Sequence, residues 1–357
     1  MLRPGRRGRE LARHARRRAR SASPINKLGV AGVAPNVTLV NLRAGQDSGF
    51  FFLQPSVDAL TYAGDHGIDV VNMSYFIDPW LFNCRANPAD SPAEQAEQRT
   101  IIEATQRALD YAHQHGVTLI AAAGNEHTNL AQVTTDGISP DYPPGTERTR
   151  TIDNNCLSLP QQGNNVISVS RSRAVEGEGR LLELRLRQDH RLGSGRLLPR
   201  RPVDRRKPEC RRPEPDPRGV SEERGRRGSA TSNPDGNSNN PFVIRDCRGS
   251  TCAYYQYIQG TSMASPHAVG VAALIVSEFG HRGRHGIGLN PLLTQAYLEA
   301  SATDTPCPTP NPFSYEDKGR PPSFTAFCEE RPSDNGFYGH GIVDALAAVS
   351  GDPLGDH

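Results

Sequence analysis

Residues 25–170 alternate between short apolar runs and amphipathic stretches. The apolar runs predict strands over Thr38–Arg43, Asp69–Tyr75, Val117–Ala123 and Val166–Ser170. Apolar residues at helical spacing predict helices over Pro55–His66 and Thr100–His115, and Gly116 ends the second. Nearly continuous apolar strands are typical of parallel sheets that are buried on both faces. The strand–helix–strand order therefore predicts a three-layer α/β fold, with a doubly wound, mostly parallel sheet between helices.

This alternation stops after residue 170 and returns near residue 240. Residues 171–228 contain no Ile, Phe, Tyr, Trp, Met, Asn or Thr, so little apolar surface offsets the entropy of ordering them. Further helices are predicted over Ser262–Phe279, Pro291–Ala302 and Ile342–Val349. The pattern divides the chain into a basic segment at 1–24 that we expect to be disordered, an N-terminal part at 25–170, an Arg-rich insert at 171–239 that we also expect to be disordered, a C-terminal part at 240–350 and a tail at 351–357.

The charge is distributed unevenly along the 357 residues, although the net charge is only +2. Residues 1–22 carry nine Arg and one Glu, and residues 171–228 carry seventeen Arg and one Lys against ten acids, so each block has a net charge of +8. The remainder is therefore acidic, at −14. No run of 18 apolar residues predicts a membrane span, and the N-terminus lacks the apolar core of a signal peptide.

The most specific motif is Gly-Thr-Ser-Met-Ala-Ser-Pro-His-Ala-Val-Gly at residues 260–270. It places Ser262 in the first turn of a helix, where free amide groups and the positive end of the helix dipole favour a developing negative charge. Pro266 lies inside the same helix, so the carbonyl group one turn earlier needs another partner. A serine that merely caps the helix is the alternative interpretation.

Two further motifs follow buried strands. Ala-Ala-Ala-Gly-Asn-Glu at residues 121–126 places the Asn125 amide after a flexible glycine, where it can donate to an oxyanion. Val-Val-Asn-Met-Ser-Tyr at residues 70–75 ends in polar groups. Taken singly, the first could be an ordinary Gly-Asn turn and the second a core strand.

The three motifs in this order resemble the subtilisin-like serine peptidases (subtilases, peptidase S8 family), as do Gly-Val-Ala-Pro at 32–35 and Gly-His-Gly-Ile-Val-Asp-Ala at 339–345. The resemblance covers about residues 25–170 and 240–350. It implies an Asp/His/Ser triad with Ser262 as the nucleophile and Asn125 as the oxyanion donor. The substrate, a protein or peptide, would pair as an added strand along Ser74, Tyr75, Ala122, Ala123 and Gly124.

The resemblance also sets expectations for cofactors, partners and localisation. We expect a secreted monomer that requires no cofactor and binds neither nucleic acid nor membrane. Asn26 and the backbone at Leu28–Val30 loosely resemble a calcium-binding loop of the family, since they offer the hard oxygen ligands that Ca²⁺ prefers. The match assigns no ligands, so no metal-binding residue is predicted.

The family's His motif, of the form HGTH, and its Asp motif are absent from the sequence. The Asp motif would lie before Met1, so we expect a truncated chain. Leu11–Arg18, Leu-Ala-Arg-His-Ala-Arg-Arg-Arg, can be encoded by bases that spell Ser-His-Gly-Thr-His-Val-Ala when read one base later. Bases that can encode Leu181–Arg185, Arg191–Arg201 and Asp216–Gly225 also give subtilase-like sequences when they are read one base later. We therefore expect both basic blocks to be frame-shifted translations.

Six cysteines lie outside the basic blocks: Cys84, Cys156, Cys247, Cys252, Cys307 and Cys328. An even number in a protease-like chain fits disulfides in a secreted protein, with buried thiols as the alternative. Cys247 and Cys252 are close enough to pair across a short loop, and the other pairings stay open.

Two other functions compete with an active peptidase. Without its His and Asp motifs the chain could be a catalytically impaired subtilase remnant. His14 has Arg neighbours rather than Gly-Thr, and His267 lies five positions along the helix from Ser262, so neither is predicted to be the catalytic base. A nucleic-acid-binding protein is the remote alternative, since basic blocks attract phosphate, but these blocks lack interleaved aromatics.

Overall fold

The computed structural model describes most of the chain outside the basic blocks. The described residues are 31–126, 128–173, 182–188, 191–192, 195–196, 216–220, 243–248, 251–258, 260–283, 286–318, 321–329, 335–351 and 354–355. The predictions for residues 1–24, His14, Asn26, Leu28–Val30 and Cys210 lie outside them.

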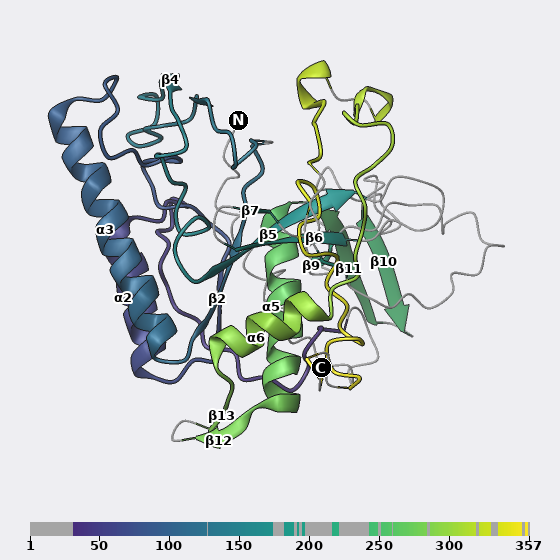
Figure 1. Ribbon diagram of the computed structural model, residues 1–357. Helices are drawn as coiled ribbons and strands as arrows, with labels where there is room; N and C mark the ends of the chain where they lie inside the picture. Colours follow the sequence, from purple (N-terminus) through teal and green to yellow (C-terminus); the bar gives the residue numbers. More distant parts are fainter. Residues whose placement is uncertain are drawn as a thin grey trace.

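A parallel sheet runs through the centre of the molecule (Figure 1). Strands β1 (Val70–Met73), β2 (Thr118–Ala122) and β5 (Val166–Arg173) are adjacent and parallel, with Asn72 opposite Ile120 and Ile120 opposite Ile167. All five residues of β2 are buried, as the apolar run predicted. The sheet continues through the antiparallel strands β6 (Leu182–Gln188) and β7 (Arg191–Leu192), and β8 (Gly195–Arg196) also pairs with β6.

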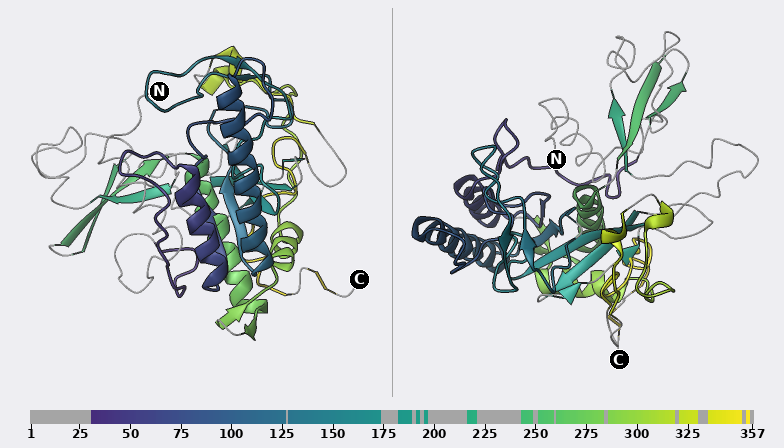
Figure 2. Two further views of the ribbon diagram at one scale, coloured as in Figure 1. Left: turned by 90° about the vertical axis from the view of Figure 1, so that its left-hand side faces the viewer. Right: turned by 90° about the horizontal axis from the view of Figure 1, so that it is seen from above.

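Helices cover both faces of this sheet, which gives the three-layer α/β fold expected from the sequence (Figures 1 and 2). On one face, α2 (Leu53–Asp65) and α3 (Pro92–Gln114) pack through Leu60, Leu109 and Ala112 against Met73 and Leu119. On the other face lie α5 (Thr261–Phe279) and α6 (Pro291–Ala300). Residues before 170 and after 240 therefore share one core, in which the buried side chains include Ile120, Ile167, Ala264, Val271 and Leu298.

Helix α5 approaches its neighbours closely because its buried residues are small. A Cβ atom added at Gly270 would lie 2.6 Å from the Cβ atom of Val33, so only glycine fits there. This contact joins the Gly-Val-Ala-Pro segment at 32–35 to the serine motif. Within the described residues, α5 is the one helix long and apolar enough to cross a membrane, but 61% of that stretch is buried inside the protein, as in a core helix.

Two predicted elements are wrong. Thr38–Arg43 is not a strand, because the described residues offer it no ladder partner and the described sheet ends at β1. Ile342–Val349 is not a helix. The Ile342 backbone exchanges two hydrogen bonds with Thr303, at 2.8 and 2.7 Å, and the Asp344 carboxylate then accepts from the next amides, leaving a single turn.

Short strands and turns complete the described structure. A second sheet has the order β10 (Val243–Arg248), β11 (Thr251–Ile258), β9 (Asp216–Val220), all antiparallel. Two hairpin pairs are β3 (Thr135–Asp136) with β4 (Arg150–Thr151) and β12 (His281–Gly283) with β13 (Gly286–Gly288). The 3₁₀ helices are η3 (Glu316–Lys318) and η4 (Pro322–Phe324). Strands β6 to β9 lie within the Arg-rich insert, most of which is outside the described residues, so its disorder stays a prediction.

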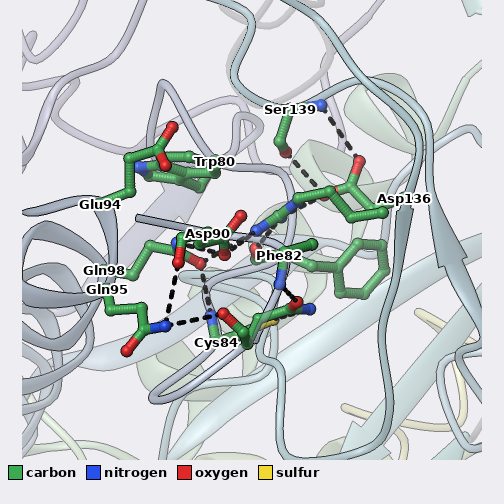
Figure 3. Close-up of polar contacts among 12 residues, drawn as sticks. Trp80, Phe82, Cys84, Asp90, Glu94, Gln95, Gln98, Asp136 and Ser139 are labelled. Carbon is green, nitrogen blue, oxygen red and sulfur yellow. Dashed lines mark hydrogen bonds and ion pairs between the residues drawn. The ribbon is translucent and has the colours of Figure 1, made fainter. Parts of the chain in front are cut away.

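Three disulfides join the six cysteines of the globular parts: Cys84–Cys156, Cys247–Cys252 and Cys307–Cys328. The predicted Cys247–Cys252 pair is confirmed. The first disulfide links the loop after β1 to the segment before β5. A buried cation reinforces the same link, because Arg150 bonds Asp90 and Asp136 at 2.7 Å each and lies 4.7 Å from the centre of the Trp80 ring. Figure 3 shows the two carboxylates beside Trp80 and Phe82.

Candidate active site

The candidate site forms where β1 and β2 end and α5 begins. Neighbouring parallel strands end at the same edge of a sheet, so Ser74, which follows β1, and Gly124, which follows β2, lie on one side. The N-terminus of α5 reaches this edge from a position more than 130 residues later in the chain. The structure thus brings together the three motifs that the sequence singled out.

Asn125 contacts the residue that immediately precedes the candidate nucleophile. Its side-chain oxygen accepts hydrogen bonds from the Thr261 amide at 2.9 Å and from the Thr261 hydroxyl at 3.3 Å. The Thr261 hydroxyl also lies 3.2 Å from the Gly124 amide and 3.1 Å from the Gly124 carbonyl. With the oxygen committed to Thr261, the NH₂ group of Asn125 is left to donate elsewhere.

Backbone geometry explains the glycines at this junction. Gly124 has φ +104° and Gly260 has φ +149°, both in the region that side chains disfavour. A Cβ atom at Gly260 would lie 3.3 Å from the Asn125 side-chain oxygen. Glycine therefore allows Asn125 to reach the first turn of α5. The backbone N–H of Asn125 donates a hydrogen bond to the carboxylate of Glu126 at 2.7 Å, which also stabilises this turn.

Ser262 lies in the first turn of α5, as the motif predicted, and its side chain is partly exposed. Its main-chain carbonyl accepts a hydrogen bond from the Ser74 hydroxyl at 3.2 Å. Pro266, four residues later, has no N–H to give to that carbonyl. The alternative partner that Pro266 requires is thus supplied by the end of β1.

Asn72 and Ser265 form a second bridge between β1 and α5 that sequence reasoning missed. The Asn72 amide donates to the Ser74 hydroxyl at 2.9 Å, and the Ser265 hydroxyl donates to the Asn72 side-chain oxygen at 2.7 Å. Ser265 is fully buried. The sequence did carry a signal for this bridge. Asn72 lies within an apolar strand and Ser265 within a helix of small residues, and a buried polar side chain needs a hydrogen-bond partner.

The other predicted substrate-binding residues differ in their surroundings. Ala122 is buried, whereas Ala123 and Gly124 are partly exposed beside Asn125. Tyr75 stacks on Phe51 with ring centres 4.3 Å apart. Burial raises the pKa of Tyr75 to about 12, although a hydrogen bond with Ser56 opposes the shift. The Tyr75 ring is therefore committed to packing against Phe51.

No described hydrogen bond joins an imidazole to the Ser262 hydroxyl. His267 points along α5, where its Nδ1 atom lies 2.7 Å from the Met263 carbonyl oxygen, which supports its structural interpretation. Burial lowers the pKa of His267, and that hydrogen bond only partly offsets the effect. Within the described ranges, no cluster of three His, Cys, Asp or Glu side chains could hold a metal ion.

Comparisons with known proteins agree with these motifs. A model of the subtilase family matches residues 19–341. A thermophilic serine proteinase from Bacillus sp. (strain AK1) is 26% identical over 285 residues, which cover 80% of this chain and 46% of that protein. Subtilisin DY from Bacillus licheniformis is 31% identical over 109 residues, covering 30% of this chain and 32% of that protein. The chain thus spans less than half the length of these curated relatives.

Solved structures also match at low sequence identity. A lanthipeptide protease is 18% identical, with a TM-score of 0.48, over 95% of this chain and 84% of that chain. The epidermin leader peptide processing serine protease from Staphylococcus aureus is 18% identical, with a TM-score of 0.48, over 94% of this chain and 62% of that chain. The family model covers most of the chain, and its motifs meet at one edge of the sheet: the chain belongs to the subtilase family of serine peptidases.

Proposed function

We propose that this chain is a secreted serine endopeptidase that hydrolyses proteins or peptides through an acyl-enzyme on Ser262. The observation that carries the proposal is the 2.9 Å hydrogen bond between the Asn125 side chain and the Thr261 amide. It brings the side-chain NH₂ group of Asn125 beside the first turn of α5, where the backbone amide of Ser262 would be the second donor. Such donors stabilise the oxyanion that forms when a serine attacks a peptide carbonyl.

Substrate would bind along the ends of β1 and β2. Extended peptides bind sheet edges through main-chain hydrogen bonds, and the backbone of Ser74, Ala123 and Gly124 lies at this edge next to Ser262. The Ser74 hydroxyl is already committed to Ser262, so the backbone rather than this side chain is the part available to substrate. No cofactor is required for acyl transfer by this route, and a structural calcium site stays without assigned ligands.

Secretion as a monomer is part of the same proposal. Three disulfides in a chain of this size suit an oxidising compartment. The curated relatives include a subtilisin and a thermophilic serine proteinase, which is consistent with a protein substrate for this chain too.

In our proposal the general base belongs to a His motif encoded in the shifted reading frame, so the sequence as printed does not carry it. Serine is a weak nucleophile unless an imidazole removes its proton. A catalytically impaired remnant is the second candidate function, and it is favoured by the lack of a described imidazole bonded to Ser262. The two candidates differ in what happens when the motif is restored at residues 11–17.

The test compares hydrolysis of a casein or peptide substrate by three chains: this chain, a restored chain with Ser-His-Gly-Thr-His-Val-Ala at residues 11–17, and the restored chain carrying Ser262→Ala. We expect the restored chain to be faster than this chain by about 10²-fold, the lower end of the usual contribution of a general base, because the family's Asp motif is still absent from the sequence. Ser262→Ala should remove the gain. Equal hydrolysis by all three chains, or none by the restored chain, would overturn the proposal. Sequencing the gene over codons 1–25 and 170–240 separately tests the frame-shift hypothesis.

A further inference from the structure

The three disulfides differ in their access to solvent and in their surroundings. Cys84, Cys156 and Cys328 are at most 4% exposed, and Cys307 is partly buried. Cys247 is exposed, although its partner Cys252 is buried. Since a dissolved thiolate must reach a sulfur atom to break a disulfide, Cys247 offers the most direct point of attack among the described cysteines.

A cation lies beside the sulfur atom that would leave in such an attack. The Arg245 side chain reaches from β10 to the Cys252 Sγ atom, with its Nη2 atom 3.4 Å away. Burial of Cys252 disfavours a thiolate, and the guanidinium opposes that effect by stabilising the negative charge. A cation in contact with the departing sulfur favours disulfide exchange, because it stabilises the charge that develops on that atom.

The fold also protects this disulfide least. Cys247 and Cys252 face each other in the register of the β10–β11 hairpin and are five residues apart in sequence, compared with 21 for Cys307–Cys328 and 72 for Cys84–Cys156. A disulfide stabilises a fold less when it closes a shorter loop. By linkage, the folded state stabilises the Cys247–Cys252 bond by the same small amount, and we expect the backbone pairing of β10 with β11 to persist when the bond opens.

From these three observations we infer that Cys247–Cys252 is a thiol–disulfide exchange site for small-molecule thiols. A thiolate attacks Cys247 Sγ and forms a new S–S bond, while the old bond breaks and its electron pair goes to Cys252 Sγ. A second thiol then releases Cys247, leaving two protein thiols and one oxidised small molecule. Two electrons pass from the two small thiols to the protein disulfide. Arg245 is the residue that stabilises the leaving thiolate, and neither step uses Ser262.

The chemistry is tested on the full chain without any need for peptidase activity. Free thiols are first blocked with iodoacetamide, and the chain is then incubated with increasing concentrations of reduced glutathione. The reaction is quenched with acid, and newly exposed cysteines are alkylated with N-ethylmaleimide and quantified by peptide mass spectrometry. We expect Cys247 and Cys252 to be labelled at a lower glutathione concentration than Cys84, Cys156, Cys307 and Cys328, while the far-ultraviolet circular dichroism stays unchanged.

Variants of Arg245 test the role of the cation. Arg245→Gln should slow the opening of Cys247–Cys252 about three- to tenfold, and Arg245→Lys should restore most of the rate. Arg43→Gln, which removes an exposed cation before α2, should leave the rate unchanged. The inference is overturned if another disulfide opens at the same glutathione concentration or if Arg245→Gln opens at the original rate. The labelling order in the unaltered chain decides the first point even if a variant fails to fold.

Discussion

The Ser74 hydroxyl donates a hydrogen bond to the main-chain carbonyl of Ser262 across 3.2 Å. This is the carbonyl that Pro266 leaves without a helical partner. The contact ties the candidate nucleophile to the end of β1, so the position of Ser262 depends on a proline inside α5 and a serine 188 residues earlier in the chain.

A double-mutant cycle measures this dependence. Ser74→Ala leaves the Ser262 carbonyl unsatisfied and should lower the free energy of unfolding by about 1–2 kcal/mol. Pro266→Ala supplies a helical N–H for the same carbonyl, so Ser74→Ala should cost less in that background. Urea unfolding of the four chains gives the coupling energy. Strictly additive effects would show that the two residues do not share this carbonyl.

Arg150 should be far more important for stability than its neighbour Arg148. Arg150→Met leaves the buried carboxylates of Asp90 and Asp136 without their shared cation, which should cost about 3–5 kcal/mol. Arg148 also pairs with Asp90, but about a third of its side chain is exposed, so Arg148→Met should cost clearly less. Chemical denaturation of both variants makes the comparison. A smaller loss for Arg150→Met than for Arg148→Met would contradict the buried network in Figure 3.

Acid should destabilise the fold through His267. Burial lowers the folded-state pKa of His267 below 6.5, so the unfolded chain binds a proton more readily. Stability contributed by neutral His267 is therefore complete above pH 6.5 and decreases as the pH falls from 6.5 towards the folded pKa. His267→Asn, which keeps a donor for the Met263 carbonyl, should reduce the slope of unfolding free energy against pH in this window. An unchanged slope in the His267→Asn chain would contradict this role of His267.

Asn125→Ala tests the oxyanion donor in the restored chain. Loss of the side-chain amide should lower kcat about 10²–10³-fold with little change in KM, a magnitude taken from a subtilisin rather than from this chain. Asn155→Ala, in an exposed loop before β5, serves as the control and should leave kcat unchanged. A change in KM alone would mean that Asn125 binds substrate without stabilising the transition state.

Periodicity predicted the central sheet and its helices well because burial dominates there. The run at Val117–Ala123 became a fully buried strand, and the helix predicted over Pro55–His66 is α2. The helix predicted from Thr100 begins earlier, at Pro92, because Ser91 and Glu94 form a capping box. Thr38–Arg43 failed because an apolar run forms a strand only where a neighbouring strand accepts its hydrogen bonds.

The sequence motifs led to the candidate residues but not to the hydrogen bonds that hold them in place. Gly-Thr-Ser and Gly-Asn-Glu made Ser262 and Asn125 candidates, since each motif combines a turn with a polar side chain, and the structure brings the two segments together. The hydrogen bond from Ser265 to Asn72 joins residues 193 positions apart, and nothing in the local pattern of either segment specifies such a contact. The same holds for Arg150, which the sequence shows only as one of many arginines.

The site of covalent labelling by a fluorophosphonate tests the central claim most directly, because this reagent reacts with a serine that is both activated and next to an oxyanion site. The restored chain is labelled, digested and mapped by mass spectrometry, with Ser262→Ala as the control. We predict a single adduct, on the peptide that contains Ser262, and none in the control. An adduct on another serine, or equal labelling of the Ser262→Ala chain, would contradict the assignment of Ser262 as the nucleophile.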